Sequence, residues 1–330
     1  MYQLPRGGKT VVPLELEGRL LGSSNTPRFS QQVSWKYGHL SAEQVSEDLR
    51  LNHNRLVSKK LIQSISAHVA VIAYQKEMEW SYALPALTQV VTHISVGRDG
   101  TTTAIRDQGY RETMCGTLSL YAANGERLHT VYTACAPEHG KDLFNSVLDM
   151  EISRIKASFP SVTYVGLADG AKDNWTYLAP HVQVEILDFY HVTQYLNEVS
   201  RVFIRGKKAA SKWLETACHD LKHSPAGAQR ILEELIAWQK KIDPDRAGIM
   251  QKTVTYFTNN TQRMHYADYQ KKGYPIGSGV TEGACKSVIK QRLSQSGMRW
   301  NIDPAQGMLI QRALLATKGR WEQFWGKYMA

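Results

Sequence analysis

Three acidic residues stand where their carboxylates could act together. Asp99 lies in VGRDG, Asp169 in VGLADGAKDNW and Glu282 in GSGVTEGACK. The first two follow apolar segments with the pattern of buried strands, so we expect each acid at a strand end. Glu282 is expected near the start of a helix, directly behind a Gly-Ser-Gly turn. If the strands that end at Asp99 and Asp169 are neighbours in one sheet, all three carboxylates could meet at its edge.

Carboxylates held that close repel one another unless cations lie between them. At ~4 Å and an effective dielectric constant of about 20, each pair costs roughly 4 kcal/mol. Hard divalent ions prefer oxygen ligands, and Mg²⁺ can share carboxylates with phosphate groups. Two ions about 3.5–4 Å apart could activate a nucleophile and stabilise the leaving oxygen of a phosphodiester displacement. We therefore predict two Mg²⁺ ions as cofactors, for which Mn²⁺ could substitute.

Each acid taken alone also has an ordinary structural explanation. Asp-Gly is a common turn dipeptide, which could account for Asp99 or Asp169. Close to a helix start, Glu282 could simply interact favourably with the helix dipole. What favours a shared site is the order of the three acids along a matching pattern of strands.

Lys and Arg residues follow Glu282 at helical spacing. Lys286 and Lys290 come at i+4 and i+8, on nearly the same face of the predicted helix. Together with Arg292 and Arg299, we predict that they bind DNA phosphates. The alternative is an i,i+4 pair of Glu282 with Lys286 on a solvated face, worth roughly a few tenths of a kcal/mol.

Three further residues could support such a site. His191 could orient a metal ligand or contact a phosphate, or it could be a histidine satisfied by packing. Asp188 could act electrostatically or serve as a helix N-cap. Trp175 could stack on a flipped or terminal base, or pack inside the protein. In each case both interpretations stay open.

The pattern of elements predicts an α/β fold. From residue 88 the order is β-β-β-α-β-α-β-α, with a hairpin signal at Asn124-Gly125 and a helix stopped by Pro160. An antiparallel meander followed by alternating units indicates one mixed sheet with helices on both faces. This is the order of an RNase H-like fold.

We divide the chain into four parts. These are an N-terminal helical DNA-binding region (1–86), the first part of an RNase H-like catalytic core (87–196), a helical insertion (197–270) and the C-terminal helices of the core (271–330). The last part is expected to end in one amphipathic helix with an aromatic end, AQGMLIQRALLATKGRWEQFWGKYMA.

The N-terminal part has the pattern of three helices. SAEQ at residues 41–44 matches a capping box, and two short helices before a longer third fit a helix-turn-helix arrangement. The third opens with Arg55, Lys59 and Lys60, which we predict to contact DNA. The alternative is an ordinary bundle with a solvated basic face.

The overall charge favours a polyanionic partner. Forty Lys and Arg residues against thirty Asp and Glu residues give a net charge of +10, and nucleic acid is the commonest partner of such a protein. Basic soluble proteins are frequent, so charge alone decides little. No apolar run approaches the ~20 residues of a membrane span, and no signal-peptide core is present. We expect a cytoplasmic, nucleoid-associated protein without membrane contact. The four cysteines are scattered without a C-x-x-C pair, which argues against a zinc site.

The sequence also resembles a known family. GSGVTEGACKSVIKQRLSQSGMRW, followed by AQGMLIQRALLATKGRWEQFW, resembles the C-terminal catalytic block of ISKra-type insertion-sequence transposases, DDE enzymes of the Mutator-like class. LADGAKDNW and DFYHVTQYL are similar too, the latter through a D-x-x-H element at Asp188 and His191. The resemblance runs from about residue 8 to the end. It implies that Asp99, Asp169 and Glu282 are the metal-binding DDE triad, although Asp107 lies near the first of them.

This resemblance implies a DNA transposase that cleaves at transposon ends and joins the freed 3′-hydroxyl to target DNA. Its partners would be transposon-end and target double-stranded DNA. Holding two ends together implies a homo-oligomer, a dimer or larger. Members often carry a Cys-rich segment before the helical region, and its absence here allows a short form, a truncated copy or an alternative start. A transposase-derived DNA-binding protein without catalysis and an RNase H-like structure-selective nuclease remain as alternatives.

Overall fold

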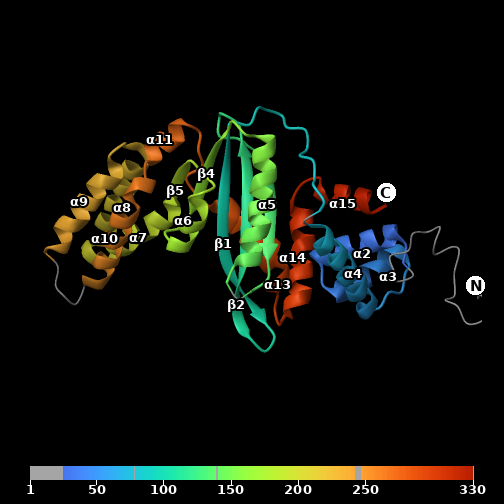
Figure 1. Cartoon of the computed structure of the whole chain (residues 1–330). Helices are drawn as coiled ribbons and strands as arrows, with labels where there is room; N and C mark the ends of the chain where they lie inside the picture. The colour runs from blue at the N-terminus through green and yellow to red at the C-terminus, as the bar shows by residue number, and fades with distance from the viewer. Residues whose placement is uncertain (1–24, 78, 139, 242–246, 330) are drawn as a thin grey trace, which may run out of the picture.

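A computed structural model describes residues 25–77, 79–138, 140–241 and 247–329. A central sheet carries helices around it, with one group of helices on the α7–α11 side and another on the α2–α4 side (Figure 1). The predicted α/β class with a mixed sheet is therefore confirmed. None of the helices in these ranges is long and apolar enough to cross a membrane.

The sheet has five strands in the order β3-β2-β1-β4-β5. Strands β1, β2 and β3 form an antiparallel meander, and β4 and β5 add to β1 in parallel. The bounds are β1 His93–Ile105, β2 Gly109–Tyr121, β3 Arg127–Cys135, β4 Thr163–Ala168 and β5 Val184–Leu187. The predicted order of elements is confirmed, and the first and fourth strands do lie side by side.

Strand β1 is longer than expected. It continues past Asp99 to Ile105, so the prediction that Asp99 ends the first strand is wrong. The reason is its pairing with β2, which runs from His93↔Tyr121 to Ile105↔Gly109. The parallel pairing with β4 stops earlier, at Gly97↔Leu167. Asp99 therefore lies just beyond the point where β1 and β4 separate.

Helices cover both faces of the sheet. On one face α5 (Asp142–Ser158) packs Phe144 and Leu148 against Leu118 of β2. On the other face the segment α12 (Gly279–Ala284), η3 (Cys285–Lys290) and α13 (Gln291–Leu293) forms one continuous helical run, whose Val288 shares a core with Ala134 of β3. The segment η3 is a π-helix, a feature often found at functional sites.

The three N-terminal helices are confirmed as α2 (Pro27–His39), α3 (Ala42–His53) and α4 (Lys59–Glu77). Both hydrogen bonds of the Ser41–Gln44 capping box are present, at 3.2 and 2.9 Å. Arg55 precedes α4, since Asn54 in a left-handed conformation ends α3.

Helices also fill the segments around β4, β5 and the predicted insertion. They are α6 (Lys172–Leu178), α7 (Phe189–Phe203), α8 (Lys207–His223), α9 (Gly227–Gln239), α10 (Ala247–Asn260), the short 3₁₀ turn η2 (Thr261–Arg263) and α11 (Tyr266–Lys271).

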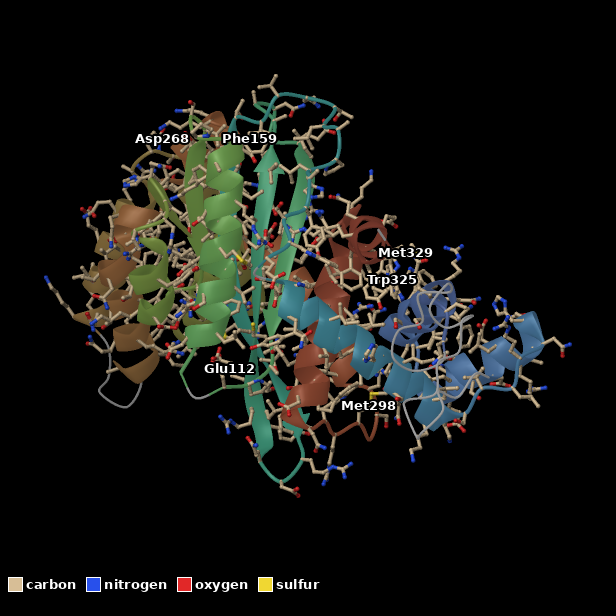
Figure 2. All side chains as sticks on the ribbon, turned by 45° about the vertical axis from the view of Figure 1, so that its right-hand side comes forward. Glu112, Phe159, Asp268, Met298, Trp325 and Met329 are labelled. Atoms are coloured by element: carbon tan, nitrogen blue, oxygen red, sulfur yellow. The ribbon has the colours of Figure 1, made fainter. Side chains whose placement is uncertain are left out.

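The C-terminal stretch forms two helices rather than the single one expected. They are α14 (Ile302–Ala316) and α15 (Arg320–Met329). Gly319 has a positive φ of 84°, which a continuous helix does not allow, so α14 ends before it. The Thr317 hydroxyl accepts the N–H of Tyr132 in β3 at 3.0 Å and fastens the segment between the two helices to the sheet. Trp325, labelled in Figure 2, is buried and packs in one core cluster with residues of α4 and α14.

One close contact fixes α12 on the sheet. A Cβ added to Gly97 of β1 would meet Thr281 Oγ1 of α12 at 2.2 Å. The same hydroxyl bonds Thr117 Oγ1 of β2 at 2.7 Å. The helix that carries Glu282 can sit this close to the sheet because position 97 has no side chain.

We predict that Gly97→Ala lowers the free energy of unfolding by about 2 kcal/mol, the usual cost of overpacking. Urea unfolding followed by circular dichroism measures it. Gly326→Ala is the control, because nothing lies within 4 Å of a Cβ there, and as a helical Gly→Ala change it should stabilise by roughly 0.5–1 kcal/mol. Equal stability of Gly97→Ala and the wild type would contradict the close contact.

Candidate functional site

The three predicted acids come from three elements that converge beside β1. Asp99 lies within β1, Asp169 directly follows β4, and Glu282 lies in the first turn of α12. Burial raises the pKa of Asp99, and the negative charges of Asp169 and Glu282 raise it further. Two donors oppose this rise: the Gly100 N–H, at 2.8 Å from Asp99 Oδ1, and the Cys285 thiol, at 3.7 Å from Oδ2. Asp99 is thus a half-buried carboxylate in the field of the other two.

Asp169 is held by its own turn. Its Oδ1 accepts the N–H of Ala171 at 3.0 Å and the side-chain amide of Asn174 at 2.8 Å. The neighbouring Gly170 lies under the ring of Tyr256, since a Cβ there would come within 2.3 Å of the ring. Tyr256 belongs to α10 and stacks on Tyr195 of α7, with ring centroids 4.0 Å apart. The predicted insertion therefore reaches the turn of Asp169.

Tyr256 was not singled out in the sequence. Burial raises its pKa, and the charges of Tyr195, Asp169 and Asp188 add to the rise. Its buried hydroxyl lies at the backbone of Gly170, a contact that opposes this rise in pKa. No local pattern around position 256 indicates this, because the contact joins segments far apart in the chain.

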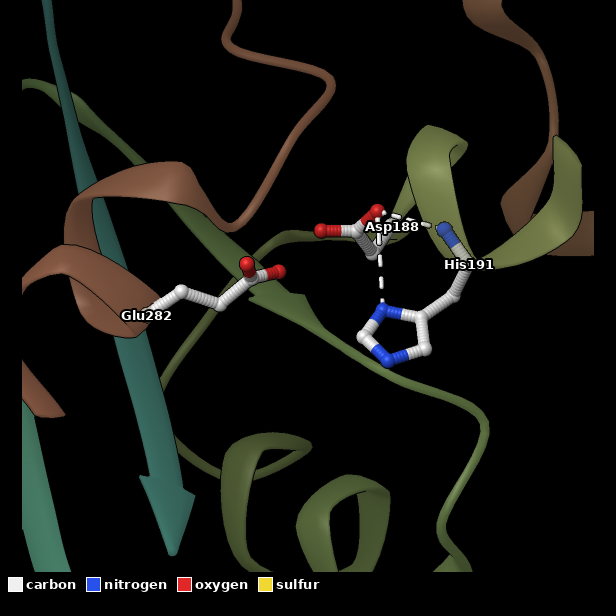
Figure 3. A group of neighbouring side chains, drawn as sticks. All are labelled: Asp188, His191 and Glu282. Carbon is white, nitrogen blue, oxygen red and sulfur yellow. Dashed lines mark hydrogen bonds and ion pairs between the residues drawn. The ribbon is translucent and has the colours of Figure 1, made fainter. Parts of the chain in front are cut away.

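The closest group of possible ligands differs from the predicted triad. Among the described residues, ligand atoms of Asp188, His191 and Glu282 lie within 4.8 Å of one another, and this group could hold a metal ion (Figure 3). Asp188 follows β5, and His191 lies in the first turn of α7. Asp99 and Asp169 do not belong to this close group.

Asp188 is fully buried and its oxygens are occupied by protein donors. Oδ1 accepts the N–H of His191 at 2.9 Å, which makes Asp188 the N-cap of α7. Oδ2 accepts the N–H of Ser278 at 2.6 Å and also the Ser278 hydroxyl. Burial alone would raise the pKa of Asp188, but these contacts with His191 and Ser278 lower it to about 2. Asp188 is thus ionised, and the N-cap interpretation is confirmed.

His191 lies beside the acids. Its Nδ1 is 3.7 Å from Asp188 Oδ1, an ion-pair distance rather than a hydrogen bond. Asp188 raises the pKa of His191 against the effect of burial, and the charges of Asp169 and Glu282 raise it too. Figure 3 shows the second ring nitrogen pointing away from Asp188.

Glu282 is bound by the turn in front of it. Its backbone N–H donates to Ser278 O at 3.0 Å, and its Oε1 accepts the Ser278 hydroxyl at 2.7 Å. A hydroxyl has one hydrogen and cannot donate to Asp188 and Glu282 at once. A cation beside Glu282 would relieve this conflict.

The basic residues behind Glu282 divide into two sets. Lys286, Lys290 and Arg299 are exposed. Arg292 is only 2% exposed, donates from Nε to Tyr37 O at 3.0 Å, and stacks over the rings of Tyr37 and Trp300. Its predicted role in DNA binding is therefore wrong, because two residues beyond Lys290 the helix turns its side chain inward.

The remaining predicted contacts also differ in exposure. Trp175 is 6% exposed and lies under the Arg263 guanidinium at 4.4 Å, so the packing interpretation holds and base stacking is excluded in this conformation. Arg55, Lys59 and Lys60 are exposed, as a DNA contact requires. Asp107 is exposed in the β1–β2 turn with φ 61°, which leaves Asp99 as the acid near the site.

Comparison of the sequence with protein-family models and with curated proteins finds no match. The functional conclusion therefore depends on the geometry of these side chains and on the resemblance described above.

We predict that Asp99→Asn raises the stability of the protein in EDTA. Since the pKa of Asp99 is raised on folding, its ionised form destabilises the folded state at neutral pH, and the amide removes this penalty. The gain should vanish below the ordinary Asp value of 3.8 and grow as the pH rises above it. Thermal unfolding across that range measures it, with the exposed Asp107→Asn as control. A lower stability at pH 7 would contradict the placement of Asp99 among the other acids.

Proposed function

We propose that the protein is a DNA transposase of the ISKra type with an RNase H-like catalytic core. The observation that carries this proposal is the convergence of Asp99, Asp169 and Glu282: two neighbouring parallel strands and one helix bring their charges into one field. The sheet order, a meander joined by two parallel strands, supports the RNase H-like part. Action on chromosomal DNA implies a place in the bacterial or archaeal cytoplasm.

The donor set fits Mg²⁺. Three carboxylates supply hard oxygen ligands, and Asp169 Oδ2 has no hydrogen-bond partner within the described ranges. Bound in a pair, Mg²⁺ ions would activate first water and then the freed 3′-hydroxyl for in-line displacement at phosphorus. The chain's own part is to hold the three carboxylates in one field, where they could bind the metal together.

Nucleic acid would be held by the exposed cations. Lys286 and Lys290 follow Glu282 along the same helical run, and Arg299 lies beside the isolated bridge of Trp300 with Ile105 in β1. Arg55, Lys59 and Lys60 would add contacts from the N-terminal helices. A homo-oligomer, needed to hold two transposon ends together, belongs to the same proposal.

We predict that Glu282→Gln lowers Mg²⁺-dependent cleavage of terminal-repeat DNA and strand joining by roughly 10³-fold, since metal-ion charge stabilisation is worth several kcal/mol. The amide keeps the size of the side chain, so DNA binding should remain. Gel assays with labelled ends measure both steps. Glu322→Gln, in the first turn of α15, is the matched control. Cleavage by Glu282→Gln at the wild-type rate would refute the assignment. Cleavage of RNA–DNA hybrids without joining would favour a nuclease.

We further predict that replacing Lys286 and Lys290 together by Gln weakens DNA binding and makes the dependence of log K on log salt shallower by about two units, one per lost phosphate contact. Fluorescence anisotropy at several salt concentrations measures it. Lys208 and Lys212 are exposed and equally spaced on α8, so their double replacement is the control. Equal salt slopes for the two double variants would show that Lys286 and Lys290 do not contact phosphate.

A further inference from the structure

The turn in front of Glu282 docks residue by residue onto the start of α7. Ile276 O accepts the N–H of Phe189 at 2.9 Å. A Cβ on Gly277 would meet the ring of Tyr190 at 2.7 Å. Ser278 donates its N–H to Asp188, and its hydroxyl lies within hydrogen-bond distance of the same carboxylate. Three consecutive residues of the turn thus contact three consecutive residues after β5.

Asp188 is the buried anchor of this contact. It is 0% exposed, and donors from His191 and Ser278 engage both of its oxygens. An ionised carboxylate saturated in this way is a strong hydrogen-bond acceptor but a poor candidate for a metal ligand. One of its oxygens lies within 4.8 Å of ligand atoms of Glu282 and His191, but both oxygens already accept hydrogen bonds from the protein.

Ser278, held by Asp188, in turn contacts Glu282. Its carbonyl accepts the backbone N–H of Glu282 at 3.0 Å, and its single hydroxyl hydrogen is shared between Asp188 Oδ2 and Glu282 Oε1, the latter 2.7 Å from the hydroxyl oxygen. On the other side of the same turn of helix, Thr281 is bonded to Thr117 of β2. The main chain and the carboxylate of Glu282 are therefore fixed from both halves of the sheet.

From these contacts we propose that Asp188 and Ser278 form a positioning unit that sets the Glu282 carboxylate for metal binding. Asp188 and Ser278 are positioning residues, not metal ligands. The inference rests on the proposed function, in which Glu282 is a ligand. Groups that orient ligands through hydrogen bonds typically change metal affinity or activity by about 10–100-fold when removed.

The test compares Ser278→Ala with Ser278→Thr, which keeps the hydroxyl, and with Ser287→Ala, an exposed serine on the same helical run. Mg²⁺ and Mn²⁺ titrations of terminal-repeat cleavage are measured together with DNA affinity. For Ser278→Ala we expect the half-saturating metal concentration to rise at least about tenfold with DNA affinity unchanged. Ser278→Thr should recover most of the loss, and Ser287→Ala should match the wild type.

A second measurement distinguishes loss of the positioning role from misfolding of a variant and from failure of the proposed function. Amide hydrogen exchange of residues 276–283 without metal should be faster in Ser278→Ala and Asp188→Asn than in the wild type, at an unchanged exchange rate in α5. Wild-type metal dependence in Ser278→Ala, or unchanged exchange in both variants, would overturn the positioning role. No metal-dependent cleavage by the wild-type protein would instead refute the proposed function, while the exchange experiment would still decide whether the unit holds Glu282.

Discussion

Repulsion among half-buried carboxylates is the constraint to which this region of the molecule is adapted. The charges of Asp169 and Glu282 raise the pKa of Asp99, so without metal the ionised form of Asp99 destabilises the folded chain. Asp188 escapes the same difficulty because backbone and hydroxyl donors surround it. The contrast separates two kinds of acid within one region. Asp188 is satisfied by the protein, whereas Asp169 keeps a free oxygen and Asp99 Oδ2 has only the weak thiol donor of Cys285, so a cation is their natural partner.

Satisfied and unsatisfied acids are joined through a single serine. Ser278 bonds Asp188, which belongs to the parallel half of the sheet, and Glu282, whose helix is docked on the antiparallel half by Thr281. The absence of a side chain at Gly97 permits that docking. Glu282 is consequently placed by elements that are remote in sequence but adjacent in the sheet order. In the arrangement we propose, Asp188 positions Glu282 through Ser278, and this brings Asp188, His191 and Glu282 close together.

The order of strands and helices and the N-terminal capping box could be predicted from the sequence, because they depend on local patterns. Alternating and helical periodicities predict the order of strands and helices, and the spacing of Ser41 and Gln44 predicts a capping box. The burial of Arg292 and Trp175, the reach of Tyr256 to Gly170 and the length of β1 depend on contacts between distant segments. Helical spacing separates Arg292 from Lys290 around the helix, but only the contact with α2 shows that the arginine is buried. The bond from Ser278 to Asp188 was missed for the same reason, although both residues lie in motifs that were singled out.

Two buried arginines, Arg292 and Arg312, connect the C-terminal helices to the end of α2. The last carbonyls of a helix lack partners within it and attract positive charge. At the end of α2, Tyr37 O accepts Nε of Arg292 at 3.0 Å, and Gly38 O accepts Arg312 at 3.0 Å. Arg292 continues the helical run of Glu282, and Arg312 belongs to α14. Because both guanidinium groups are buried, displacing α2 would remove one carbonyl acceptor from each of them, which is costly. The N-terminal helices are therefore held in a defined orientation to the run that carries Glu282.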